Sequence, residues 1–181
     1  GHFTWTRSLP LMLCDLAALL AGAVLVWSRP GLVVGAGGRG GGGGEKHRWM
    51  RTVLYFWAIG LSTQAFLTPI LQEGYGTLRF WTFWIGHTAI VGTAIYDMVV
   101  RGYRPAWKDY RVGVVIPLGY ALVVIVLNLT LDGSGLLAPG EHANYGYLGN
   151  STPKNPTLMD KLGAWPFRLI LVTAIVLGLF A

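Results

Sequence analysis

Cys14 and His87 are the two side chains of this 181-residue chain that could together support nucleophilic catalysis. A cysteine thiolate attacks carbonyl carbons well, and a neighbouring imidazole can take the thiol proton and later return it to a leaving group. The side-chain amides of Gln64 and Asn128 could donate hydrogen bonds to the oxyanion that forms on the attacked carbonyl. This chemistry would be acyl transfer, for which we expect no metal and no cofactor.

Cys14 and His87 each have another possible role that competes with catalysis. A free cysteine is among the most commonly buried residues and is usually inert, so Cys14 could simply pack. His87 could serve as an axial ligand of a haem or chlorophyll-type pigment, with Gly86 leaving room for the ring, but one histidine of this kind is a weak signal. Whether the chain is an enzyme stays open on these residues alone.

Five apolar runs must position these side chains, and each is close to the ~20 residues that a helix needs to cross a bilayer. Hydrophobic residues make up 53% of the chain and charged residues only 12%, with the charges concentrated between the runs. Because lipid cannot satisfy backbone N–H and C=O groups, each run should be helical. We therefore predict an all-α polytopic transmembrane helix bundle that forms one domain over residues 1–181. The runs are 9–27, 53–71, 80–100, 112–131 and 164–181.

Basic residues are unevenly distributed among the connections between the runs. Positive charge marks the cytoplasmic loops, so we predict that 28–52 and 101–111 are cytoplasmic and that 132–163 faces outward. Seven of the eight residues in 37–44 are glycine, which indicates a flexible linker within the first of these loops. Since the basic residues flank membrane spans, the net charge of +6 predicts contact with lipid headgroups and no nucleic-acid partner.

With these spans, five helices bring polar side chains to one depth in the outer half of the bilayer. A charge in hydrocarbon costs at least ~2.5–3.5 kcal/mol, so Asp15 should have a partner, and we expect an ion pair with Arg168. Asp97 lies near the opposite end of its span and should pair with Arg101 one turn later. The competing interpretation is that such groups only hold helices together. The residues of this predicted layer are Cys14, Asp15, Gln64, His87, Asn128 and Arg168.

The two ends of the chain lead to a further expectation. The chain begins with Gly1 rather than methionine, and it ends within an apolar run. We therefore expect native residues beyond both ends, including a sixth span before the first. The outward segment 132–163 is rich in turn-forming residues and could cover the polar layer or dock a partner.

Four stretches of the chain resemble the YwaF-like bacterial integral membrane proteins. That family usually has six helices, and the resemblance implies a protein of the bacterial cytoplasmic membrane. It extends to a eukaryotic relative that acts as an acyltransferase in ether-phospholipid synthesis, through a cysteine and a histidine in membrane helices. By that resemblance, Cys14 is the acyl-accepting nucleophile and His87 its base, while Met12 stands where many bacterial members have a histidine. The stretches are SLPLMLCDLAALLAG (8–22), YFWAIGLSTQAFLTPIL (55–71), FWTFWIGHTAIV (80–91) and NYGYLGN…PTLMDKLGAWPF (144–167).

Two functions follow as the main hypotheses. The first is acyl transfer from a phospholipid substrate in the outer half of the bilayer, through Cys14 and His87. The second is a non-catalytic accessory subunit that packs against other membrane subunits, which Met12 and the apolar surroundings of Cys14 favour. A transporter or channel ranks last, because the inner halves of the spans are nearly all apolar.

Overall fold

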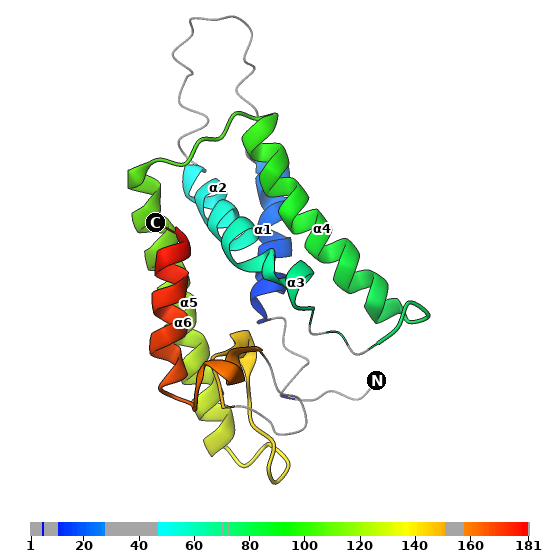
Figure 1. Cartoon of the computed structure of the whole chain (residues 1–181), viewed down its shortest axis with the longest axis vertical. Coiled ribbons are helices and arrows are strands. Elements are labelled where there is room, and N and C mark those ends of the chain that lie inside the picture. The colour runs from blue at the N-terminus through cyan, green and yellow to red at the C-terminus, as the bar shows by residue number, and fades with distance from the viewer. Residues whose placement is uncertain are drawn as a thin grey trace, which may run out of the picture. The chain divides into compact units, whose positions relative to one another are not determined.

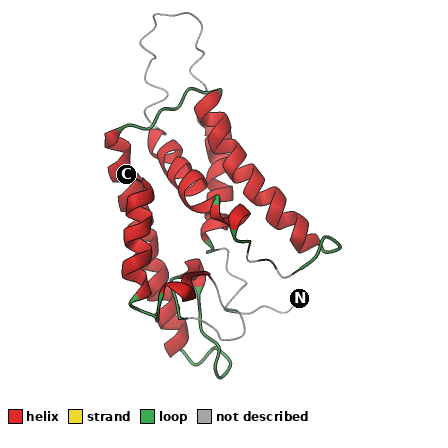
Figure 2. Ribbon diagram, viewed as in Figure 1, coloured by secondary structure: helices red, strands yellow, loops and turns green. Residues whose placement is uncertain are grey.

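All regular structure in the described part of the chain is helical. The computed structural model describes residues 5, 11–27, 47–69, 71, 73–150 and 158–180, and Figures 1 and 2 show helices without a strand among them. This confirms the all-α prediction for those residues. The flexible linker predicted at 37–44 lies outside the described residues.

One helix is both long and apolar enough to cross a membrane, judged by its length and composition among the described residues. This helix is α5, whereas α1 and α6 are apolar but shorter. The five-span bundle therefore stays a prediction. In chain order the elements are α1 (Leu13–Trp27), α2 (Arg48–Tyr55), the π-helix η1 (Phe56–Ser62), α3 (Gln64–Leu67), α4 (Leu78–Val99), α5 (Trp107–Gly133), the 3-10 helices η2 (Tyr145–Tyr147) and η3 (Leu158–Leu162), and α6 (Arg168–Phe180).

The second apolar run, 53–71, forms three consecutive helical pieces and not one uniform helix. The first piece begins at Arg48, before the run itself, and the π-helix η1 follows it directly. The last piece ends at Leu67, because Thr68 leaves the helical region with φ −136° and ψ 70°. Thr68 precedes Pro69, and the ring of a proline disfavours helical backbone in the residue before it.

The other boundaries reflect local capping and loop chemistry. The hydroxyl of Thr77 accepts a hydrogen bond from the backbone N–H of Phe80 at 3.3 Å, so α4 begins within two residues of the predicted start of the run 80–100. Helix α5 extends beyond the run 112–131 at both ends and continues through Pro117. Helix α6 begins at Arg168, four residues later than predicted.

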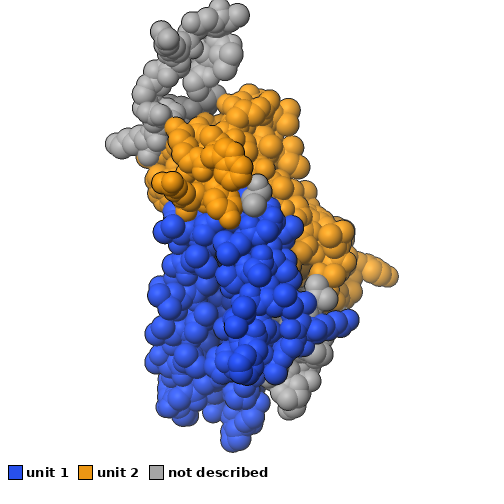
Figure 3. Space-filling view, turned by 60° about the vertical axis from the view of Figure 1, so that its left-hand side comes forward, with its two compact units in different colours: residues 1–16, 114–181 blue, residues 17–113 orange. Residues whose placement is uncertain are grey.

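The chain divides into two compact units (Figure 3): residues 1–16 with 114–181 form unit 1, and residues 17–113 form unit 2. In unit 1 the buried core consists of residues from α5 and from the segment that follows it. Leu11 and Met12, just before α1, pack against this core. The core residues are Val124, Leu131, Ala143 and Tyr145.

Unit 2 packs α2 and η1 against α4. Its part of α1 buries Ala17, Ala21 and Val24, which recur at helical spacing and leave at most 5% of their surface exposed. Phe56, the first residue of η1, contacts α5 at Gly113, and the absence of a side chain at Gly113 leaves space for the aromatic ring. A Cβ atom at position 113 would lie under 3.0 Å from three atoms of that ring.

We expect Gly113→Ala to lower the free energy of unfolding by about 1–3 kcal/mol, because the added methyl overpacks a site that the Phe56 ring already fills. The matched control is Gly92→Ala in α4, where no atom lies within 4 Å of an added Cβ. That control should leave stability unchanged or raise it by up to ~1 kcal/mol, through helix propensity. Unfolding of the purified protein in detergent micelles measures both, and equal stability of the two variants would contradict the packing argument.

Candidate functional site

Cys14 lies in the first turn of α1 and is half-buried. The turn closes with the backbone N–H of Asp15 donating to the Met12 carbonyl at 3.0 Å. The hydroxyl of Tyr120 on α5 donates to the Leu11 carbonyl at 2.8 Å, so the segment that leads to Cys14 is attached to the helix beside it in unit 1. The thiol is thereby positioned by contacts on the residues before it, while the neighbouring Asp15 is exposed.

His87 is held by the backbone of its own helix and is 7% exposed. Its Nδ1 lies 2.8 Å from the Phe83 carbonyl oxygen. Because a carbonyl only accepts, Nδ1 carries the proton in this bond, which corresponds to the tautomer with its lone pair on Nε2. The sequence thus provides both the imidazole and, one turn earlier, the acceptor that sets its tautomer.

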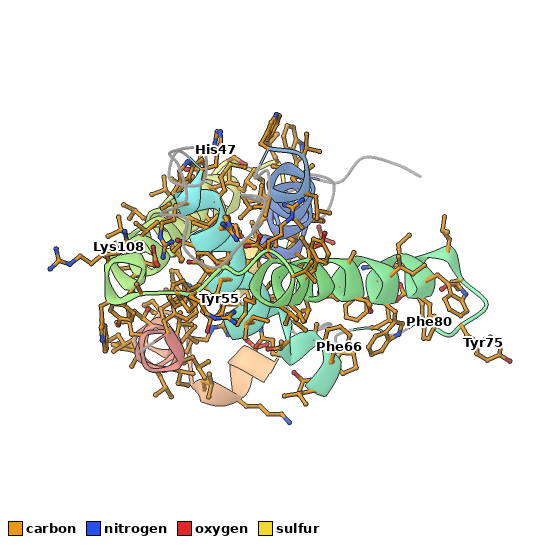
Figure 4. All side chains as sticks on the ribbon, turned by 90° about the horizontal axis from the view of Figure 1, so that it is seen from above. His47, Tyr55, Phe66, Tyr75, Phe80 and Lys108 are labelled. Atoms are coloured by element: carbon orange, nitrogen blue, oxygen red, sulfur yellow. The ribbon has the colours of Figure 1, made fainter. Side chains whose placement is uncertain are left out.

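The rings of Phe83 and Phe66 lie against the His87 imidazole in unit 2. The ring centroids of Phe83 and His87 are 4.3 Å apart, and Phe66 meets the imidazole edge-on at 6.4 Å. The ring centroids of Trp84 and Phe66 are 5.9 Å apart. Figure 4 shows Phe66 and Phe80 on the same side of α4. These rings exclude water from the histidine and would strengthen electrostatic interactions made there.

The structure distributes the predicted polar layer over both units. Cys14 and Asp15 belong to unit 1 with Asn128 and Arg168, whereas Gln64 and His87 belong to unit 2. The pairing of Cys14 with His87 therefore stays a prediction. Gln64 begins α3 and is exposed.

Asn128 forms a reciprocal pair of hydrogen bonds with the backbone of Tyr145. Its side-chain amide donates to the Tyr145 carbonyl at 3.1 Å, and its side-chain oxygen accepts from the Tyr145 N–H at 2.9 Å. Asn128 is 2% exposed. The NH₂ and the oxygen of this one side-chain amide both attach the segment after α5 to that helix, which is a structural role within unit 1.

The predicted ion pair between Asp15 and Arg168 is wrong. The Arg168 guanidinium pairs instead with Asp160 of η3 and donates to the Gly149 carbonyl at 2.6 Å. Arg168 is 2% exposed, so the pairing neutralises a fully buried cation at the start of α6. The carboxylate eight residues earlier reaches this charge because the chain turns back through residues 163–167 before α6 begins.

A family comparison identifies what the chain is related to. A sequence model described as the TMEM164 family matches residues 1–181, the whole chain. The chain belongs to the TMEM164 family. TMEM164 proteins are transmembrane proteins, which agrees with the apolar helices, and no curated protein or solved structure matches the chain.

The second predicted ion pair of this TMEM164-family chain is also wrong. Asp97 binds Arg51 of α2 at 2.8 Å and not Arg101. Arg101 donates to the carbonyls of Val24 and Leu25 at 2.9 and 3.0 Å, which satisfies acceptors at the C-terminal end of α1. The i,i+4 spacing favoured a local pair, but tertiary packing gives each charge a better partner.

Sequence reasoning missed a charged cluster centred on Tyr103, between α4 and α5. The Arg48 and Arg51 guanidinium groups lie 5.3 and 5.0 Å from the centre of the Tyr103 ring, and the Tyr103 hydroxyl lies 3.0 Å from that of Thr52. Burial raises the pKa of the Tyr103 phenol above its ordinary value. The sequence signal for this cluster was the pair of acidic residues Asp97 and Asp109 near the ends of predicted spans, together with basic residues before the second span. The cluster comprises Arg48, Arg51, Thr52, Asp97, Tyr103 and Asp109.

Asp109 accepts hydrogen bonds from two side chains and one backbone group in or beside the Tyr103 cluster. It forms a bidentate pair with Arg48, in which Nε donates to Oδ1 at 2.8 Å and Nη2 donates to Oδ2. It also accepts from the Thr52 hydroxyl at 3.3 Å and from the backbone N–H of Ala106 at 2.8 Å. The last bond is the reaching-back half of a capping box, so this carboxylate also starts α5.

We expect Asp109→Asn to destabilise the protein by about 3 kcal/mol, because it leaves Arg48 without its counter-charge. This value is at the lower end of the destabilisation expected when one partner of a buried ion pair is removed, because the Arg48 side chain is 29% exposed. Glu73→Gln is the matched control, because it breaks an exposed pair with Arg79 and should cost at most ~1 kcal/mol. Chemical unfolding in micelles measures the difference, and equal losses would show that Asp109 has no special role.

Proposed function

We propose that this TMEM164-family chain is a polytopic protein of the bacterial cytoplasmic membrane that transfers acyl chains between phospholipids. Cys14 accepts the acyl chain, and His87 acts as the general base. Family membership over residues 1–181 supports the membrane setting, and the resemblance to a cysteine- and histidine-dependent lipid acyltransferase supports the reaction. The proposal keeps the five spans, with 28–52 and 101–111 cytoplasmic and 132–163 outward.

The outward-facing surfaces of the apolar helices suit a lipid environment. Large hydrophobic side chains on α5, the helix long and apolar enough to cross a membrane, are exposed, and water would oppose this exposure. In a bilayer the same side chains meet acyl chains at no cost. They include Val115, Leu118, Leu122, Val123, Val126 and Leu129.

The reaction balances without a cofactor. The His87 imidazole takes the thiol proton, the Cys14 sulfur attacks the ester carbonyl carbon of a phospholipid, and the ester C–O bond breaks. The proton passes to the leaving oxygen, so the products are a lysophospholipid and an acyl-thioester on Cys14. The hydroxyl of a second lysophospholipid then attacks the thioester, gives its proton to His87, and restores the thiol.

The observation that carries this proposal is the hydrogen bond from His87 Nδ1 to the Phe83 carbonyl. It orients the imidazole and leaves the lone pair on Nε2, as a general base requires before a proton can be taken. The aromatic surroundings of His87 keep the ring away from bulk water. Cys14, half-buried in the first turn of a helix, retains partial access for an acyl group.

The alternative is a non-catalytic accessory subunit that binds other membrane proteins. It is favoured by the purely structural contacts of Asn128 and Arg168, two members of the predicted polar layer. Under this alternative the chain copurifies with a partner in mild detergent and transfers no acyl chain. The two functions therefore differ in a measurable outcome.

Cys14→Ala should abolish acyl transfer. The purified chain in phospholipid vesicles, supplied with an acyl-labelled donor and a lysophospholipid acceptor, should form a hydroxylamine-sensitive label. Cys14 is the only cysteine, so a thioester can form at no other position. Cys14→Ser, which keeps a hydroxyl nucleophile and nearly the same size, should retain the fold and lose the hydroxylamine-sensitive label. Normal turnover in Cys14→Ala would exclude the thioester mechanism.

His87→Asn should lower the transfer rate by about 10²–10⁴-fold, the usual contribution of a general base. Asparagine keeps an N–H that can donate to the Phe83 carbonyl but lacks the basic nitrogen. His142→Asn is the matched control, because that histidine pairs with Asp132 at 3.1 Å in unit 1 and should have no effect on rate. The rate of thioester formation measures both variants, and equal rates for His87→Asn and the unaltered chain would remove His87 from the mechanism.

A further inference from the structure

A shallow depression in unit 2 is lined by residues suited to hold a phosphate, and it shares no residue with the proposed acyl-transfer pair. Its volume is about 320 Å³, at the lower end of the ~300–1,000 Å³ typical of small-molecule sites. We call it the α2–α5 pocket. Its lining residues are Arg48, Trp49 and Thr52 of α2, and Lys108, Asp109 and Val112 of α5.

The lining carries one net positive charge, from two cations and one carboxylate. The carboxylate is already occupied, because Asp109 accepts hydrogen bonds from Arg48, Thr52 and the backbone of Ala106. Lys108 is exposed and forms no ion pair with any residue in the described part of the chain. The Lys108 ammonium is therefore the charge that an incoming anion would meet.

The pocket lies at the first two turns of α5, the helix that is long and apolar enough to cross a membrane. Lys108 and Asp109 lie directly before the apolar run 112–131, and Val112 is its first residue. Trp49 is 50% exposed and Trp107, next to Lys108, is 78% exposed. Exposed tryptophans beside a basic residue are typical of the headgroup region, where an indole contacts lipid and water together.

We propose that the α2–α5 pocket binds the phosphate-bearing headgroup of an anionic phospholipid, with Lys108 as its main contact. The positive ends of the α2 and α5 dipoles add to the attraction, since both helices begin at the pocket. Trp49 and Val112 provide apolar surface that suits the glycerol and the first carbons of the acyl chains. A soluble phosphate compound offers the same oxygens but gains nothing from that apolar surface.

The test measures retention of phosphatidylglycerol against phosphatidylcholine by the purified full chain, by native mass spectrometry from mixed micelles. Lys108→Ala should lower phosphatidylglycerol retention about five-fold, the effect of one cation at a membrane surface, whereas Lys108→Arg should keep it. Lys161→Ala is the matched control, because it removes the same charge from an exposed position in η3 and should change nothing. Glycerol 3-phosphate, which has the phosphate without acyl chains, should not displace the lipid.

Three results would overturn the assignment. Unchanged phosphatidylglycerol retention in Lys108→Ala would remove the pocket as the binding site. An equal loss in Lys161→Ala would show unspecific attraction to the basic surface. Displacement by glycerol 3-phosphate at concentrations similar to that of the lipid would mean that the pocket binds a soluble phosphate compound. None of these results depends on acyl transfer, so the two proposals fail independently.

Discussion

The bidentate ion pair between Arg48 and Asp109 is the constraint on which unit 2 depends. Asp109 starts α5 through its bond to the Ala106 backbone and at the same time binds the first residue of α2. One carboxylate therefore begins one helix and attaches another. Because 29% of the Arg48 side chain is exposed, water still reaches it, and the desolvation cost is smaller than that of a fully buried pair.

Two other basic residues near the apolar helices also have partners close to a helix end. Arg168 starts α6 and finds Asp160 in the preceding 3-10 helix, while Arg101 satisfies carbonyls at the end of α1. Partners of this kind require no charge to enter the hydrocarbon.

The sequence predicted the features that depend on neighbouring residues better than those that depend on tertiary packing. The start of α4 follows from Thr77 and the apolar run behind it, both of which are visible in the sequence. The ion pairs of Asp97 and Arg168 could not be predicted from depth or from i,i+4 spacing, because tertiary packing and a turn of the chain chose the partners. Cys14 and His87 were selected by residue type, and only the structure supplied the tautomer of the histidine.

The π-helix η1 lies shortly before the segment that contributes Phe66 to the surroundings of His87. A π-turn inserts one residue, which rotates everything after it by about 100° relative to an uninterrupted α-helix. Phe66 in α3 lies against Trp84 and His87, and Gln64 at the start of α3 is exposed. Such π segments recur at functional sites despite their poorer backbone geometry. Here the segment precedes the short helix whose Phe66 ring meets, edge-on, the histidine we propose as the base.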